Sequence, residues 1–385
     1  MLQDELFGRQ MDHVLVRFHA IAGSQNLEWL KLVSIIRDDK LVHDTFKALI
    51  CGLDSTTTTS TRRRKCVEIL PAIRKRLSSL YGTRCVNMVH LVFLLSYQEL
   101  LVWNNPKAWM MHIWGLSTIV QTLGPDVFRG VLELRTLRQF RLFNVSEHAN
   151  LRWSPVANIQ QVALNLFLRR RSFFEAAQWL HVPWSGGVAK DLLDHAVDTI
   201  ACVPGSLAEC DRIRNEGATT KCLHEEVTRM TNALNVWRFE RLARHICSIS
   251  GKPANIELIV QKLSTGTLVD AHIGQAVVLH LSNWLLLSRL EPIYTASLPW
   301  SRQYLIESIL SISEEFSYRQ RGMGVLPWTF AIRVALFTPL QDDETLKPRG
   351  RDLCMRIESR YSVRMLSDII ASLPGANDKI LKFDD

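Results

Sequence analysis

Six side chains in this sequence together offer aromatic surface and hydrogen-bond donors, which is the chemistry expected of a pocket for an apolar small molecule. Tryptophans would form the walls, and three polar residues would donate hydrogen bonds to a ligand oxygen. The predicted ligand-binding residues are Trp109, Trp300 and Trp328, and the predicted catalytic residues are His112, Tyr304 and Arg138. The chain has 11 tryptophans in all, and their excess favours an enclosed cavity.

Each of these residues also has a purely structural interpretation. Large rings fill helical cores, and a histidine such as His112 on an apolar helix is more often a satisfied core residue. Arg138 and its neighbour Arg135 can orient a carbonyl or carboxylate, or they can pair with Glu133 or Glu99.

One acidic cluster has spacing that would suit a cation. Asp191, Asp194, His195 and Asp198 are three, four and seven residues apart, so they share one helix face. Terpene synthases hold magnesium on such helices, but with two adjacent aspartates and a third three positions later, which this chain lacks. We therefore interpret the cluster as a solvated acidic face, and we predict no metal site and no cofactor.

Familiar catalytic motifs are missing from the sequence. There is no G-x-S-x-G nucleophile motif, no glycine-rich phosphate loop after a strand and no H-E-x-x-H zinc motif. Classical hydrolases, kinases and metalloproteases are thereby excluded.

Apolar residues recur at intervals of three and four almost everywhere, which predicts an all-α protein. Gly-Pro, Asn-Pro and similar breaks divide the chain into about a dozen helices. We predict one domain over residues 1–385, a single array of packed helices with a softer seam near 203–220. Residues 54–65 are predicted to be a flexible loop rich in threonine and arginine.

Composition limits the function classes further. The formal net charge is +8, with basic runs at 62–65, 74–76 and 169–171, but no motif for reading DNA accompanies them. Apolar runs are too short to cross a bilayer, and the acidic N-terminus is unlike a signal peptide. Eight scattered cysteines fit reduced thiols, so we expect a cytoplasmic or nuclear protein.

The stretch from Asn87 to Phe143 resembles the regulatory domain of fungal-specific transcription factors. The resemblance depends on Trp109, His112 and Gly115, on the break at Gly124 and Pro125, and on the arginine-bearing helix that follows. It extends over roughly residues 13 to 372 and is strongest in 87 to 143.

The chain differs from that family in its cysteines. The family's DNA reader is a cluster of six cysteines around two zinc ions, built on C-x-x-C pairs. No two cysteines here are closer than eight positions, so we expect a regulatory-type domain without direct DNA binding.

Three hypotheses follow. The first is a domain co-opted in secondary metabolism as a cofactor-free cyclase or cycloaddition (pericyclase-type) catalyst, which positions a terpenoid or polyketide intermediate and polarises one carbonyl. The alternative is a ligand-sensing transcriptional regulator, which acts as a homodimer or through a partner DNA-binding protein. The third is an inert scaffold with a filled core.

Overall fold

The computed structural model describes residues 29–31, 33, 36, 39–53, 58–79, 86–99, 106–146, 171–216, 221–252, 254–290, 298–319, 325–337 and 346–361. The all-α prediction is confirmed, since these residues form fourteen α-helices and contain no strand. The α-helices are α2 (Lys40–Leu53), α3 (Thr59–Ser78), α4 (Asn87–Gln98), α5 (Pro106–Leu123), α6 (Val131–Ser146), α8 (Ala177–His181), α9 (Leu192–Glu216), α10 (Lys221–Val236), α11 (Ala243–Ser250), α12 (Ile256–Ser264), α13 (Ala271–Leu287), α14 (Arg302–Arg319), α15 (Val325–Phe337) and α16 (Leu346–Tyr361). Short turns of other helix types are η2 (Pro125–Arg129), η4 (Phe173–Glu175), η5 (Val182–Trp184), η6 (Trp237–Leu242) and η7 (Ser288–Leu290).

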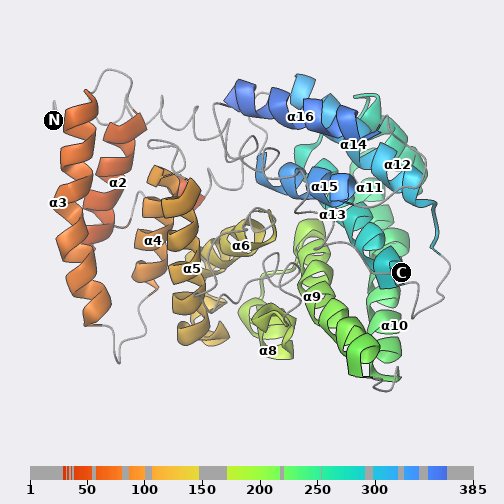
Figure 1. Cartoon of the computed structure of the whole chain (residues 1–385), viewed down its shortest axis with the longest axis horizontal. Coiled ribbons are helices and arrows are strands. Elements are labelled where there is room, and N and C mark those ends of the chain that lie inside the picture. Colours follow the sequence, from red (N-terminus) through yellow and green to blue (C-terminus); the bar gives the residue numbers. More distant parts are fainter. Residues whose placement is uncertain are drawn as a thin grey trace.

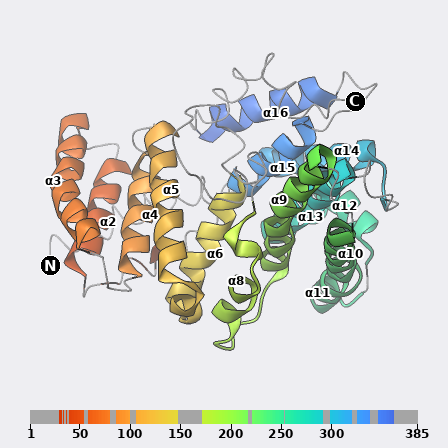
Figure 2. The ribbon, with the colours of Figure 1, turned by 60° about the horizontal axis from the view of Figure 1, so that its bottom comes forward.

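The helices form an elongated array (Figure 1). At one end α3, α2, α4 and α5 stand side by side, α6, α8 and α9 occupy the middle, and α10 to α16 form the other end, an order that Figure 2 shows from a second side. One hydrophobic cluster runs from Trp29 before α2 to Ile357 in α16. Helices from both ends of the array thus contribute to one core.

Helix α13 is the centre of the C-terminal part. Every residue from Ile273 to Leu287 is buried, and the helix packs against α9, α14 and α15. A helix that is apolar on all sides is expected at such a fully enclosed position. Asp270 is the N-cap of α13, and its side chain accepts a hydrogen bond from the Ile273 amide at 3.0 Å.

Gly274 on α13 allows α14 and α15 to approach closely. A Cβ atom at this position would lie 2.9 Å from the rings of Phe316 and Trp328, which stack at 4.8 Å. We expect Gly274→Ala to lower the free energy of unfolding by about 1–3 kcal/mol, because the rings would have to move.

Gly115 provides the matched control, since it also lies inside a helix but a Cβ atom added there would have no other atom within 4 Å. Gly115→Ala should stabilise the protein by about 0.5–1 kcal/mol through helix propensity. Urea denaturation of both variants measures the difference; equal stability changes would show that the space around Gly274 is not limiting.

Residues 203–216 of the predicted seam belong to α9 and form no break in the chain. Pro204 and Gly205 suggested a break, but Ile200, Val203 and Leu207 are buried at helical spacing. This burial outweighs the cost of a proline inside a helix, which is about 3 kcal/mol. Residues 217–220 lie outside the described part of the chain.

The predicted loop at 54–65 is also wrong for residues 59–65, which form the first turns of α3. The Thr58 side chain accepts a hydrogen bond from the Thr61 amide at 3.4 Å and so caps the helix. The threonine run therefore marks a helix start, while residues 54–57 lie outside the described residues.

Candidate functional site

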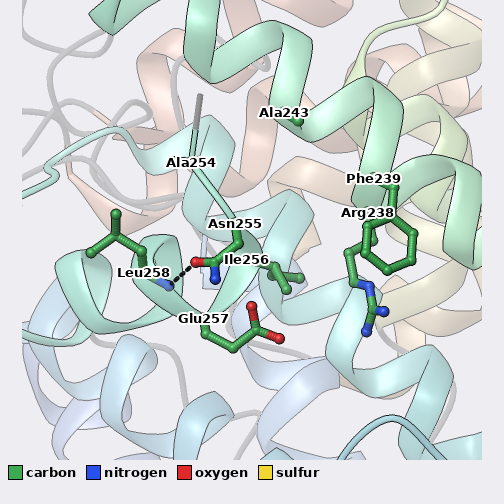
Figure 3. Close-up of a pocket in the computed structure, with 8 residues that line it drawn as sticks. All are labelled: Arg238, Phe239, Ala243, Ala254, Asn255, Ile256, Glu257 and Leu258. Carbon is green, nitrogen blue, oxygen red and sulfur yellow. Dashed lines mark hydrogen bonds between the residues drawn. The ribbon is translucent and has the colours of Figure 1, made fainter. Parts of the chain in front are cut away.

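A pocket of about 490 Å³ opens between η6 and the start of α12. Figure 3 shows its lining, in which η6 and the first residue of α11 face the first turn of α12. The lining residues are Arg238, Phe239, Ala243, Ala254, Asn255, Ile256, Glu257 and Leu258. This volume lies within the range of small-molecule sites.

The π-helical turn η6 gives one wall of the pocket its shape. It interrupts an otherwise continuous helix between α10 and α11, and such turns often occur at functional sites. Trp237 is buried and donates from its indole nitrogen to the Leu192 carbonyl at 2.9 Å. Arg238 and Phe239 line the pocket, and 63% of Phe239 is exposed.

The opposite wall is the capped start of α12. Gly251 ends α11 in the left-handed conformation, with φ of 69°. The Asn255 side chain then accepts a hydrogen bond from the Leu258 amide at 2.9 Å, as Figure 3 shows. The pocket consequently faces the amide-rich, electropositive end of this helix.

Arg238 lies between two aromatic rings. Its guanidinium carbon is 3.9 Å from the centre of the Phe239 ring and 4.8 Å from that of Trp300. Its Nε atom is buried and has no hydrogen-bond partner among the described residues. Burial lowers the pKa of Arg238, and Glu257 acts in the opposite direction. The side chain is held in place by stacking, with donors that remain for a ligand.

Glu257 and Trp300 complete the polar side of the pocket. The Trp300 indole nitrogen donates to the Glu257 carboxylate at 3.0 Å. This bond orients the ring that lies against Arg238, and Figure 3 shows the Glu257 carboxylate on the same side as the guanidinium. A ligand that presents both an acceptor and a donor would meet a partner for each.

A line of rings leads from the pocket into the core. Trp300 stacks on Tyr304 at 6.1 Å and meets Trp284 edge-on at 6.3 Å. Trp284 donates to His280 Nε2 at 3.1 Å, and His280 stacks on Trp237 at 4.2 Å. These contacts connect both walls of the pocket through buried aromatic residues.

Among the predicted site residues, Trp300 and Tyr304 come together beside this pocket. They precede and begin α14, and both are partly buried. Burial raises the pKa of Tyr304, and a hydrogen bond with the Ser308 side chain lowers it. The phenol therefore stays protonated at neutral pH, as a hydrogen-bond donor must.

Trp328 lies elsewhere. Its ring is fully buried against Phe316, which is twelve residues beyond Tyr304 on α14 and so about 18 Å further along that helix. Trp328 therefore does not line the pocket at η6, because α15 packs against the far half of α14.

His112 also lies apart from Trp300 and Tyr304. It is on α5, with Nε2 3.9 Å from a Glu99 carboxylate oxygen at the end of α4. Helices α4 and α5 occupy the other half of the array in both views (Figures 1 and 2). Trp109 is in the same helix, and its side chain lies outside the described residues.

Arg138 is part of a buried ion cluster. It donates to Asp194 at 2.6 Å and to the Ala189 carbonyl at 3.0 Å, so its predicted pairing with Glu133 or Glu99 is wrong. Because its guanidinium is engaged between α6 and α9, it does not face the pocket at η6.

The aspartates of α9 belong to this cluster and not to a solvated face. Asp194 is buried, and burial raises its pKa while Arg138 and Arg141 lower it. Asp198 binds both Arg141 and Lys190, the latter at 2.5 Å. The sequence pattern missed their role because the cationic partners come from α6 and the segment before α9. Within the described residues, no group of three or more His, Cys, Asp or Glu side chains could hold a metal ion.

Four polar or aromatic pocket residues were absent from the sequence prediction: Arg238, Phe239, Asn255 and Glu257. Asn255 carried a detectable signal, as an N-cap residue directly before an apolar helix. Arg238 and Phe239 lie on the η6 turn, which has no sequence pattern of its own, and Glu257 joins them only because α12 lies on the other side of the pocket.

No family model, no curated protein and no solved structure matches this chain. In the described part of the chain, no helix is both long and apolar enough to span a membrane.

Proposed function

We propose that this protein is a helical domain of the fungal transcription-factor regulatory type that binds a small molecule in the pocket between η6 and α12. Its proposed role is in secondary metabolism, as a cofactor-free cyclase or cycloaddition catalyst of a terpenoid or polyketide intermediate. The observation that carries the proposal is Arg238, which lines the pocket and whose guanidinium stacks on Phe239 and Trp300.

The lining defines the kind of ligand. Phe239, Ile256 and Leu258 offer apolar contact, which favours an unsaturated carbon skeleton. Arg238 supplies charged N–H donors to a carbonyl or carboxylate oxygen, and Glu257 accepts from a hydroxyl or an enol. Donors that are already fixed in place stabilise negative charge on a carbonyl oxygen without reorganisation, which is the contribution that a cyclisation needs.

The proposed donor differs from those that the sequence predicts. Of the three predicted catalytic residues, only Tyr304 lies near the pocket, through its stacking on Trp300. Arg238 takes the polarising role in place of Arg138 and His112. Tyr304 supports the Trp300 ring that positions Arg238.

The alternative function is a ligand-sensing regulator that acts through a partner protein. It would use the same pocket, and the exposed cations of α3 favour it because they present a charged surface at the end of the array. A catalyst converts its ligand, whereas a sensor releases it unchanged. Analysis of ligand chemistry after incubation therefore separates the two functions.

The pocket is tested by titration with 2-naphthoate, a flat aromatic acid, and ligand-observed NMR measures its binding. Arg238→Leu is expected to weaken its binding roughly tenfold or more, because a charge-assisted hydrogen bond contributes about 1.5–3 kcal/mol. Trp300→Ala should weaken binding as well, since Arg238 loses one of its two supporting rings.

Arg244→Leu is the matched control. Arg244 lies on α11, is 74% exposed and pairs with Glu240, and it does not line the pocket. Its substitution should leave naphthoate binding unchanged. Equal affinity of the Arg238→Leu and Arg244→Leu variants would remove Arg238 from the site.

A further inference from the structure

We propose that the outer face of α3 is a docking surface for an amphipathic, acidic helix of a partner protein. This surface is distinct from the pocket and does not depend on it. Helix α3 is the outermost helix at one end of the array in both views (Figures 1 and 2). Its partner would be recognised by charge and by a narrow apolar stripe.

The charge of α3 is concentrated. Its 20 residues include seven basic residues and one acidic residue, Glu68, in a chain whose net charge is +8. Arg64, Lys65, Arg74 and Lys75 are exposed. A one-signed surface of this kind attracts a partner of opposite charge and accelerates its association.

Another cation of α3, Arg76, holds the helix in place. Arg76 binds Asp39 at 2.6 Å, and Asp39 also accepts from Asn87 at 2.9 Å, which connects α3 to the starts of α2 and α4. Burial raises the pKa of Asp39, but these contacts outweigh it and hold that pKa below its usual value. The helix is anchored, and the outward cations keep a fixed arrangement.

An apolar stripe runs beside the cations. Val67, Leu70 and Leu77 share one face, with Arg74 between the last two, because these four residues follow at intervals of three and four. Val67 is 55% exposed and Leu77 38% exposed, while Leu70 is half-buried. A partner helix with apolar residues at the same spacing would cover this stripe, with its carboxylates beside the cations.

The same observations disfavour two other polyanions. A membrane surface would need a broad apolar face, but Ile69 and Ile73 are buried in a small cluster with Ala48 and Leu95. A nucleic acid backbone would meet Glu68 in the middle of the outer face, where it already pairs with Arg64 at 3.6 Å. Neither explains the exposed valine and leucine.

The test uses a synthetic helical peptide with leucines spaced three and four apart and glutamates along both margins. Its binding to the full chain is followed by fluorescence anisotropy. Two double variants separate charge from apolar contact: Arg74→Glu with Lys75→Glu, and Val67→Ser with Leu77→Ser. Each is expected to weaken peptide binding roughly tenfold or more, and added salt should weaken it further.

The control carries the same charge change on another helix. Lys347 and Arg351 are exposed on α16, and Lys347→Glu with Arg351→Glu should leave peptide binding unchanged. A 20-base-pair DNA duplex is titrated in parallel. An equal loss of peptide binding in the control variant would overturn the proposal. Duplex binding as tight as peptide binding would also overturn it, if Val67→Ser with Leu77→Ser leaves the duplex affinity unchanged.

Discussion

Asp198→Ala is expected to destabilise the protein by about 3–5 kcal/mol. Asp198 is the carboxylate that binds both Arg141 and Lys190, and Arg141 is only 2% exposed. Removing it leaves the buried Arg141 and the half-buried Lys190 without the carboxylate that they share, and a broken buried ion pair costs far more than an exposed one. The free energy of unfolding in urea, followed by circular dichroism, measures the loss.

Asp126→Ala is the control for this experiment. Asp126 pairs with Arg129 at 2.6 Å, but both side chains are more than half exposed. An exposed pair contributes only about 0–1 kcal/mol because water and salt screen it. A similar small change for Asp198→Ala would show that the cluster between α6 and α9 does not hold these elements together.

Acidification from pH 7 to pH 5 is expected to lower the free energy of unfolding by about 4–6 kcal/mol. Burial lowers the pKa of His280 to about 3 and those of His90 and His195 to about 4, while a histidine in the unfolded chain titrates near 6.5. Between pH 6.5 and 4 the unfolded chain therefore binds more protons than the folded one, so stability falls as pH falls. Each fully buried histidine contributes about 2 kcal/mol between pH 7 and pH 5, and the half-buried His195 contributes up to that amount.

Burial keeps the rings of His280 and His90 neutral, and for His280 a hydrogen bond acts in the same direction. His280 Nε2 accepts from Trp284, and a protonated ring could not accept. His90 lies in the core beside Thr136, at 2.9 Å. Asp39 does not disturb the measurement, because its lowered pKa removes stability only below about pH 4.

Urea denaturation at both pH values tests this prediction, and His280→Gln provides the comparison. The variant should lose about a third to a half of the pH dependence, whatever its stability at pH 7. A free energy of unfolding that is the same at pH 7 and pH 5 would mean that these histidines are protonated in the folded protein.

Local sequence signals predicted those helix ends that are determined by a proline or glycine at the end itself. Helix α5 begins at Pro106, and the break at Gly124 has φ of 76° before the η2 turn. Gly251 ends α11 in the left-handed conformation, with φ of 69°. At these ends glycine and proline act on their own backbone and no packing opposes them, so the sequence signal and the structure agree.

Sequence patterns failed where distant segments decide the outcome. Pro204 suggested a break, yet packing keeps it inside α9, and Asp194 looked solvated although Arg138 from α6 binds it. The pocket is the clearest example, because η6 and α12 meet only in the fold. Trp300 was found through its residue type, whereas Arg238 was missed because its two aromatic neighbours give it a role that its sequence context does not show.

The most direct test of small-molecule binding at η6 is native mass spectrometry of the protein after incubation with an organic extract of the producing organism. The wild type and the Arg238→Leu variant are compared, and the extract is analysed afterwards for converted products. We predict that the wild type retains a bound terpenoid or polyketide that the variant loses, and that a cyclised product accumulates only with the wild type. A wild-type spectrum without a bound small molecule, or the same bound mass in both proteins, would contradict ligand binding by Arg238 in this pocket.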